Sequence, residues 1–284
     1  MSLASKSTHT YVKVPQVYML EGPNLNAKVA SEAIYAEEVE IIPGTKKGKW
    51  IQIQTCRDGY KGWIQASSIQ KMKSPYLQPT DTVLKIARLR AFVHRITDTE
   101  QVPLLALAKG TTLKVVQEKE EQNRRWIEVR LINGKSAFIQ RGDVVINPKT
   151  MTLSEMLEDS KSELNVPYAY GGTSTFGSDC SGFVQRQFAK MDIKIPRDSK
   201  DQIKWDGFKS IALEELEVGD SIFWGVSVDK IRHVGIYLGQ NQFIHQTVQE
   251  LKPYARISSL DDAKWNGKSD WPYRAARRLK SFLP

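Results

Sequence analysis

Apolar and polar residues alternate with a period of two in two segments of the first half of the chain. The first segment holds AIYAEEVEII, GKWIQIQ and DGYKGWIQASSI, and the second holds QVPLLALAKGTTLKVV, RRWIEVR and INGKSAFIQRGDVV. In each segment a Trp-Ile pair starts an alternating run, an Asx-Gly turn follows, and an aromatic-Ile pair comes next. This pattern predicts short antiparallel strands joined by hairpins. Because the unit occurs only twice, we expect two small β barrels rather than a solenoid.

The second half of the chain has a different pattern. TLSEMLEDSKSEL predicts a helix capped by Thr152 or Ser154, because its apolar residues fall on one face. CSGFVQRQFAK, from Cys180, predicts a second helix with an apolar side. Apolar runs that predict strands follow at 220–224, 233–239, 242–247 and 273–279. Helices followed by a sheet are typical of an α+β domain.

Two proline-containing stretches with little periodicity separate these regions. KMKSPYLQPT, at 71–80, lies between the two β segments, and Asn147-Pro148 precedes the first helix. Proline interrupts both helices and strand ladders, so such stretches indicate boundaries. We therefore predict a first β domain at 1–75, a second at 76–150 and an α+β domain at 151–284.

Composition and charge limit the classes of protein to which this chain can belong. The chain has 284 residues, of which 40% are hydrophobic and 26% charged, and no apolar run approaches the ~18 residues of a membrane span. The N-terminus has no apolar signal-peptide core, so we expect a cytoplasmic protein, or a periplasmic or secreted one if the N-terminus was trimmed. The net charge of +9 is scattered rather than gathered into a basic stripe, so we expect no nucleic-acid partner.

The two cysteines differ in their surroundings. Two cysteines make no disulfide framework, which favours a reducing compartment. Cys56 follows the alternating run after Trp50, and we expect it to be buried. Cys180 lies in the polar, glycine-flanked stretch SDCSG at a predicted helix start. A helix N-terminus and a nearby imidazolium both lower a thiol pKa, which suits a nucleophile.

Two histidines follow Cys180 along the chain. His233 opens one predicted strand, and His245 lies on the next, beyond a tight LGQNQ turn. Adjacent antiparallel strands would bring the two imidazoles together, so one could orient the other. The residues alone leave alternatives open: a buried inert cysteine, satisfied core histidines, or a zinc site made by the three side chains. No further Cys or carboxylate lies at ligand-like spacing, which weighs against the metal.

The stretch from 166 to 185 resembles the signature of the NlpC family of papain-like cysteine peptidases. The matching residues are Tyr168, Tyr170, Gly171, Gly172, Asp179, Cys180, Ser181, Gly182 and Phe183. Further matches follow in family order: Pro196, Arg197, Asp198, Ser199, Gln202, Gly219, Asp220, Phe223, His233 through Tyr237, and Phe243 through His245. The resemblance covers most of 151–284. The GWI ending of the first β segment resembles bacterial SH3-like domains, which are commonly wall-targeting or substrate-gating modules.

The resemblance implies a multidomain protein with two small all-β SH3-like barrels followed by an α+β papain-like NlpC catalytic domain. It implies Cys180 as nucleophile, His233 as general base, His245 as the orienting third member and no cofactor. Tyr168 matches a tyrosine whose hydroxyl assists the oxyanion site. Tyr170 stands where relatives often carry Trp, and we expect it to serve loop packing.

Two SH3-like domains before an NlpC domain are similar to the peptidases that cleave γ-D-glutamyl-L-diamino acid bonds of murein peptides, including the meso-diaminopimelate type. That resemblance implies recognition of a free N-terminal L-Ala, with Asp179 binding its ammonium, although Asp179 also suits a helix cap. Ser181, Ser199 and Tyr60 match substrate-binding positions, and Tyr60 also suits barrel packing. The acidic residue expected from the first barrel has no clear match; Gln52 and Gln54 stand where it is expected.

Other functions compete with this one. A hydrolase of intact cell wall would use the SH3-like domains as anchors, and a non-catalytic wall-binding protein would carry an inert Cys180. An acyltransferase or thioesterase on the same broad fold is a further alternative. The permuted acyltransferase relatives place His before Cys, the reverse of the order here, which weighs against it. We expect murein peptides as partners, with peptidoglycan itself as the larger alternative, and a monomeric chain without a membrane span.

Overall fold

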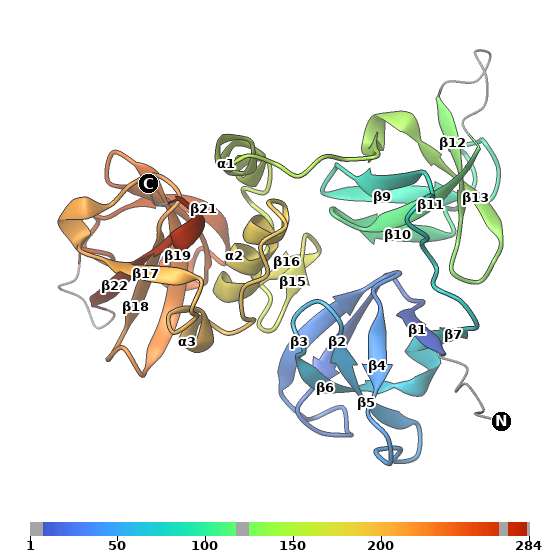
Figure 1. Ribbon diagram of the computed structural model, residues 1–284, viewed down its shortest axis with the longest axis horizontal. Helices are drawn as coiled ribbons and strands as arrows, with labels where there is room; N and C mark the ends of the chain where they lie inside the picture. The colour runs from blue at the N-terminus through green and yellow to red at the C-terminus, as the bar shows by residue number, and fades with distance from the viewer. Residues whose placement is uncertain (1–7, 118–124, 267–271, 283–284) are drawn as a thin grey trace. The chain divides into compact units, whose positions relative to one another are not determined.

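The computed structural model describes residues 8–117, 125–266 and 272–282. The chain forms two compact units, Met1–Lys149 and Thr150–Pro284. Figure 1 shows strands throughout the first unit and the helices α1, α2 and α3 in the second. The finer division of the first unit at residues 75 and 76 stays a prediction.

The first segment folds into a five-stranded antiparallel sheet beside a two-stranded one. The orders are β3-β2-β6-β5-β4 and β1-β7. The strands are β1 (His9–Val12), β2 (Gln16–Leu20), β3 (Val29–Ile34), β4 (Val39–Ile41), β5 (Trp50–Thr55), β6 (Lys61–Gln65) and β7 (Ile69–Met72). Ile51, Ile53 and Ile64 are buried in the core of these sheets. Gly59, with φ of 71°, takes a left-handed conformation in the turn that leads into β6.

The second segment folds into a seven-stranded antiparallel sheet. Its order is β10-β9-β13-β12-β11-β8-β14. The strands are β8 (Val83–Ile86), β9 (Arg90–His94), β10 (Leu105–Ala108), β11 (Thr112–Gln117), β12 (Trp126–Arg130), β13 (Ser136–Gln140) and β14 (Val144–Ile146). Ile127 and Val129 of β12 lie opposite Ile139 and Ala137 of β13, and all four are fully buried. The repeated alternation therefore produces the inward-facing apolar side of each sheet.

Three tyrosines connect the two β segments within the first unit. The hydroxyl of Tyr11 accepts the backbone N–H of Tyr76 at 3.0 Å, and the hydroxyl of Tyr35 accepts that of Ile132 at 3.1 Å. All three rings belong to one apolar cluster with Leu84 and its neighbours. The two segments thus share a core, which the hydrophobic pattern of either one could not reveal.

The second unit contains a six-stranded antiparallel sheet of order β17-β22-β18-β19-β20-β21. The strands are β17 (Phe208–Ile211), β18 (Ser221–Gly225), β19 (Ile231–Gly239), β20 (Gln242–Thr247), β21 (Tyr254–Ser259) and β22 (Tyr273–Leu279), and β15 (Thr173–Ser174) and β16 (Gly177–Ser178) form a separate ribbon. The four expected strands are confirmed. The two outermost strands, β17 and β21, were not predicted, because their short sequences FKSI and YARISS have weak apolar alternation.

The helices of this unit are α1 (Leu153–Lys161), α2 (Cys180–Ala189) and α3 (Ser199–Gln202). Thr152 caps α1 through a capping box with Glu155, which confirms the expected start. The apolar side of α2, with Phe183, Val184 and Phe188, packs in one core with residues of the sheet. One-turn 3-10 helices lie at Ala66–Ser68, Arg141–Asp143, Leu213–Glu215, Gln249–Leu251 and Lys280–Phe282.

Cys56 contradicts its expected burial. The strand that carries the alternation ends at Thr55, and Cys56 lies in the turn that follows, where it is exposed. The alternating pattern stops one residue earlier than the sequence suggested.

Candidate active site

Cys180 is the first residue of α2 and lies against the backbone of β19. Its Sγ is 3.9 Å from the carbonyl oxygen of Arg232 and is hydrogen-bonded by the backbone of Val234. The residue pairs between β19 and β20 run from Gly239 only as far as Ile236. The sulfur therefore meets the β19 backbone beyond the end of that ladder, on both sides of His233.

His233 and His245 form a hydrogen-bonded pair. Nε2 of His233 lies 2.7 Å from Nδ1 of His245, and Nε2 of His245 lies 3.0 Å from Oγ of Ser258 on β21. Both imidazoles are buried. The expectation that neighbouring strands bring the two histidines together is thus confirmed. Since Nε2 of His233 is hydrogen-bonded to His245, Nδ1 is the ring nitrogen that can act as a base toward Cys180.

Aromatic rings surround the histidine pair. The ring of Trp265 is centred 4.9 Å from that of His233 and 4.8 Å from that of His245, and Trp224 and Phe243 also pack on the pair. These rings exclude water from the 2.7 Å bond, which strengthens it. Sequence reasoning missed Trp265, because it lies in a turn outside every apolar run and no spacing relates it to the histidines.

Burial keeps the resting side chains neutral. It raises the pKa of the Cys180 thiol to about 12, and the charge of Asp179 adds to the rise. It lowers the pKa of His233 to about 3, and the charge of Arg256 adds to the fall. The sequence favoured a lowered thiol pKa at the helix start, but desolvation of the thiolate outweighs that effect. The proton would therefore leave sulfur during attack rather than before it.

Tyr168 lies in the loop that precedes α2. Its backbone pairs with that of Ser178, the residue two before Cys180. Burial, and then the proximity of Cys180, raise the pKa of its hydroxyl well above the usual range. The phenol therefore remains a hydrogen-bond donor near the sulfur at all working pH values. Tyr170 is 67% exposed, so the structure does not give it the packing role that the sequence suggested.

Asp179 is the N-cap of α2 and the partner of Arg197. Its Oδ1 accepts the N–H of Gly182 at 2.8 Å, and its Oδ2 accepts that of Gly171 at 2.9 Å. Arg197 donates to both oxygens, at 3.0 and 2.7 Å. Ser181 donates its hydroxyl to the same carboxylate at 3.2 Å. The carboxylate is thus occupied by donors, and its charge is balanced by a buried guanidinium.

The remaining predicted residues lie in two places. Ser181 is buried on α2 and its hydroxyl also accepts from Arg197 at 2.9 Å, whereas Ser199 begins α3 and is half-buried. Tyr60 belongs to the other compact unit, where it packs partly on the core of the first barrel. Their roles in substrate binding stay predictions.

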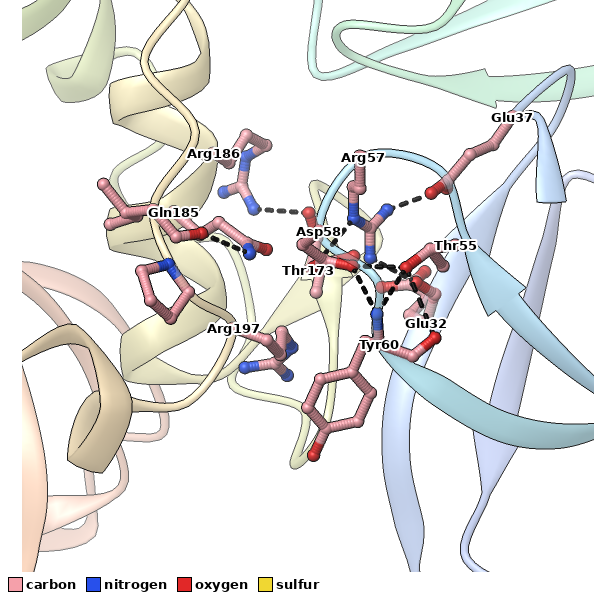
Figure 2. A network of polar contacts seen from close by, with 12 residues as sticks. Glu32, Glu37, Thr55, Arg57, Asp58, Tyr60, Thr173, Gln185, Arg186 and Arg197 are labelled. Atoms are coloured by element: carbon pink, nitrogen blue, oxygen red, sulfur yellow. Dashed lines mark hydrogen bonds and ion pairs between the residues drawn. The ribbon is translucent and has the colours of Figure 1, made fainter. Parts of the chain in front are cut away.

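Figure 2 shows a cluster of polar contacts around the turn that carries Tyr60. Arg57 pairs with Glu37 at 2.7 Å and donates to the carbonyl oxygen of Glu32 at 2.6 Å. The Tyr60 N–H is accepted by Thr55 at 3.1 Å. Gln52 and Gln54, where an acid was expected, lie on β5. Glu32, on β3, contributes its backbone carbonyl to this cluster, and the sequence analysis had not singled it out.

A buried ion cluster holds the helix that carries Cys180. The Glu163 carboxylate, fully buried, pairs with Arg186 and with Lys190 at 2.7 Å, and Gln187 donates to it at 3.0 Å. Arg186 also donates to the carbonyl of Thr173 at 2.9 Å (Figure 2). Glu163, in the turn after α1, therefore holds Arg186 of α2, and Arg186 in turn ties the helix to the ribbon strand β15.

The described residues contain no group of three or more His, Cys, Asp and Glu side chains placed to hold a metal ion. Within the same residues, no helix has the length and apolar character needed to cross a membrane.

The fold and these side chains define the class of protein, a papain-like cysteine peptidase. Residues 165–271 match the NlpC/P60 family, and residues 19–69 match the bacterial dipeptidyl-peptidase Sh3 domain. The chain belongs to the NlpC/P60 family. The predicted order of SH3-like β region and α+β NlpC domain is confirmed.

Relatives connect this family membership to the cell wall. The γ-D-glutamyl-L-lysine dipeptidyl-peptidase of Bacillus subtilis is 27% identical over 227 residues, which cover 76% of this chain and 72% of that protein. MepS of Escherichia coli, a murein DD-endopeptidase and LD-carboxypeptidase, is 33% identical over 129 residues, covering 45% and 63%. The chain is thus a peptidase of the cell-wall class.

The crystal structure of an NlpC/P60 family protein from Bacillus cereus has the same fold. It superposes with a TM-score of 0.80 and 21% sequence identity, and the match covers 96% of this chain and 99% of that one.

Proposed function

We propose that this protein hydrolyses the γ-D-glutamyl-L-diamino acid bond of murein peptides that carry a free N-terminal L-Ala. Cys180 is the nucleophile, His233 the general base, His245 the orienting member and Tyr168 an oxyanion donor. The observation that carries the proposal is Sγ of Cys180 against the β19 backbone on both sides of His233, whose other nitrogen is held by His245 at 2.7 Å.

Each role follows from this arrangement. Sulfur attacks the γ-carbonyl carbon of D-Glu while its proton passes to Nδ1 of His233, so no separate thiolate has to persist in a buried site. The Cys180 N–H at the start of α2 and the Tyr168 hydroxyl donate to the oxyanion. His233 then protonates the leaving amine, which leaves a thioester. Water, deprotonated by His233, cleaves the thioester and restores the thiol.

The bond is proposed from the relatives and the domain order. The match to the Bacillus subtilis peptidase spans the SH3-like region as well as the catalytic unit. That peptidase is named for the γ-D-glutamyl-L-lysine bond and for release of a dipeptide. A dipeptidyl-peptidase releases the first two residues at the amino end of its substrate, which supports recognition of a free N-terminal residue. Both L-lysine and meso-diaminopimelate fit the proposed class.

Recognition of the amino end by Asp179 has a structural condition. Both oxygens of the carboxylate already accept hydrogen bonds, and Arg197 balances its charge. An incoming ammonium must therefore replace or share one of these donors. We propose that Asp179 binds the ammonium while Arg197 stays in place, with Ser181, Ser199 and Tyr60 as further contacts.

The first experiment is mass spectrometry of L-Ala-γ-D-Glu tripeptides ending in meso-diaminopimelate or L-Lys, incubated with wild type and Cys180→Ala. Release of L-Ala-D-Glu by wild type alone is expected, and the relative rates identify the preferred diamino acid. N-acetylated tripeptides should be poor substrates. Equal cleavage of acetylated and free peptides would remove the amino-end requirement. Cleavage of purified murein but of neither tripeptide would replace the proposal with hydrolysis of intact wall.

A further inference from the structure

Arg256 lies beside the histidine pair on the neighbouring strand. In the β20–β21 ladder it is directly opposite His245. Directly opposite residues of antiparallel strands point to the same face, with Cβ atoms ~4.5–5.5 Å apart. Arg256 and Ser258 are two residues apart on β21, so they share this face, and Ser258 holds the far nitrogen of His245 at 3.0 Å.

The charge of Arg256 is poorly shielded from the imidazoles. Its side chain is only 11% exposed, and its Nε is buried without a hydrogen-bond partner among the described residues. Its carboxylate partner is Glu250, whose side chain is 40% exposed and is therefore better solvated than the guanidinium. A buried cation with one solvated counterion keeps a positive field on its neighbours.

Glu250 reaches this position from a strained turn. Its backbone has φ of 61°, and that of Leu251 has φ of 57°, both in the left-handed region that non-glycine residues rarely adopt. The turn follows β20 and is held by the N–H of Gln249 on the hydroxyl of Thr247 at 3.1 Å. The fold thus maintains an unfavourable backbone conformation at the residue that pairs with Arg256.

The proposed reaction requires one particular protonation state of the pair. Nδ1 of His233 can accept the Cys180 proton only if Nε2 carries the ring proton and donates it to Nδ1 of His245. A protonated His245 would instead donate to Nε2 of His233, and the remaining ring proton would then occupy the nitrogen that must act as base. His245 must therefore stay neutral.

Resting on that proposed function, we infer that Arg256 is a positioning residue that keeps His245 in its neutral, accepting form, and that Glu250 sets the strength of this effect. The direction of titration agrees, because burial, the charge on His233 and the charge on Arg256 all lower the pKa of His245. The other titratable or charged side chains on α2, β19 and β21 are Cys180, Arg186, Arg232, Tyr237 and Tyr254, and Arg232, next to His233 in the strand, is exposed.

The test reads the protonation of His245 directly by NMR titration of the ring resonances in the full chain. The chain has only 4 histidines, so a His245→Asn sample assigns the signal. Arg256→Gln should move the His245 midpoint upward by roughly one pH unit, and Glu250→Gln should move it downward. Arg256→Lys should retain the wild-type midpoint. Lys252→Gln removes the same charge from an exposed position of the same turn and should change nothing.

A second readout follows the thiol. The rate of Cys180 alkylation by iodoacetamide is measured on the peptide that contains Cys180, which separates it from exposed Cys56. As the pH is lowered, this rate should begin to fall at a higher pH in Arg256→Gln than in wild type. Midpoints for Arg256→Gln and Glu250→Gln that equal wild type would overturn the inference. If Arg256→Gln does not fold, a His245 midpoint in Glu250→Gln that equals the wild-type value would by itself overturn the inference. A shifted His245 midpoint together with an unreactive Cys180 would instead reject the proposed function and leave the positioning role standing.

Discussion

His233 and His245 are joined by a 2.7 Å hydrogen bond between Nε2 and Nδ1, inside a ring of aromatic side chains. In the proposed mechanism the residue that orients the base is itself an imidazole rather than a carboxylate. A neutral orienting group adds no negative charge to the buried site. It would fix the tautomer of His233 by accepting a hydrogen bond from its Nε2–H, and this requires that Nδ1 of His245 stay unprotonated.

Removal of the acceptor at 245 should slow the chemical step. His245→Ala is expected to lower kcat roughly 10²- to 10⁴-fold with little change in KM, because His233 loses its orientation and tautomer. His245→Asn, whose amide oxygen can still accept from Nε2, should retain at least ~10-fold more activity than the alanine variant. Steady-state kinetics on the tripeptide check this. Equal activity of the two variants would show that the acceptor is not what matters at this position.

The charge of Asp179 should determine the preference for a free amino end. Asp179→Asn keeps an oxygen for the N–H of Gly182 and removes the charge. The ratio of rates on free and N-acetylated tripeptides should fall roughly 10- to 100-fold, the range for a hydrogen bond to a charged group. Asp198→Asn removes a carboxylate whose side chain does not cap α3 and should leave the ratio unchanged. A ratio that survives in Asp179→Asn would make the residue solely a helix cap and a partner of Arg197.

The Glu163 cluster should make the fold sensitive to acid. Burial alone would raise the pKa of Glu163, but Arg186 and Lys190 outweigh it and lower the pKa to about 2, from an ordinary value of 4.5. The carboxylate therefore stabilises the fold above pH 4.5, and this contribution is lost as pH falls toward 2. Glu163→Gln should cost ~3–5 kcal/mol at neutral pH, because Arg186 loses its buried carboxylate partner and Lys190 loses one of its two carboxylates.

Denaturant unfolding at several pH values checks this prediction. The variant should lose less stability than wild type between pH 4.5 and 2. Glu158→Gln, in a solvent-exposed pair with Lys161, should unfold like wild type. A Glu163→Gln variant as stable as wild type at neutral pH would mean that the cluster is replaceable.

The helix that carries Cys180 should not tolerate a side chain at 182. A Cβ on Gly182 would lie 2.2 Å from the carbonyl oxygen of Gly172, so the loop and the helix would have to separate. Gly182→Ala should destabilise the fold by ~1–3 kcal/mol and lower activity, because the N-terminus of α2 is displaced. Gly142→Ala, where a Cβ would meet nothing within 4 Å, is the control and should have the melting temperature of wild type. Equal melting temperatures for both variants would contradict the close approach.

The sequence carried most of the local structure and the identity of the chemical groups. The alternation around Trp50 and Trp126 predicted the hairpins, and the cap at Thr152 and the apolar side of α2 predicted the helices. These features depend on neighbours along the chain, so a pattern can show them. The short outer strands β17 and β21 escaped because pairing with the sheet, rather than their own alternation, makes them strands.

By itself, then, the sequence determined which residues could do chemistry, Cys180, His233 and His245, and the order of the β and α+β parts. Only the tertiary structure decided their state. Burial keeps the thiol of Cys180 and the imidazole of His233 neutral. Arg197 pairs with Asp179, and the β20–β21 register places Arg256 opposite His245. Desolvation and cross-strand contacts depend on groups distant in the chain, and for that reason no local pattern records them.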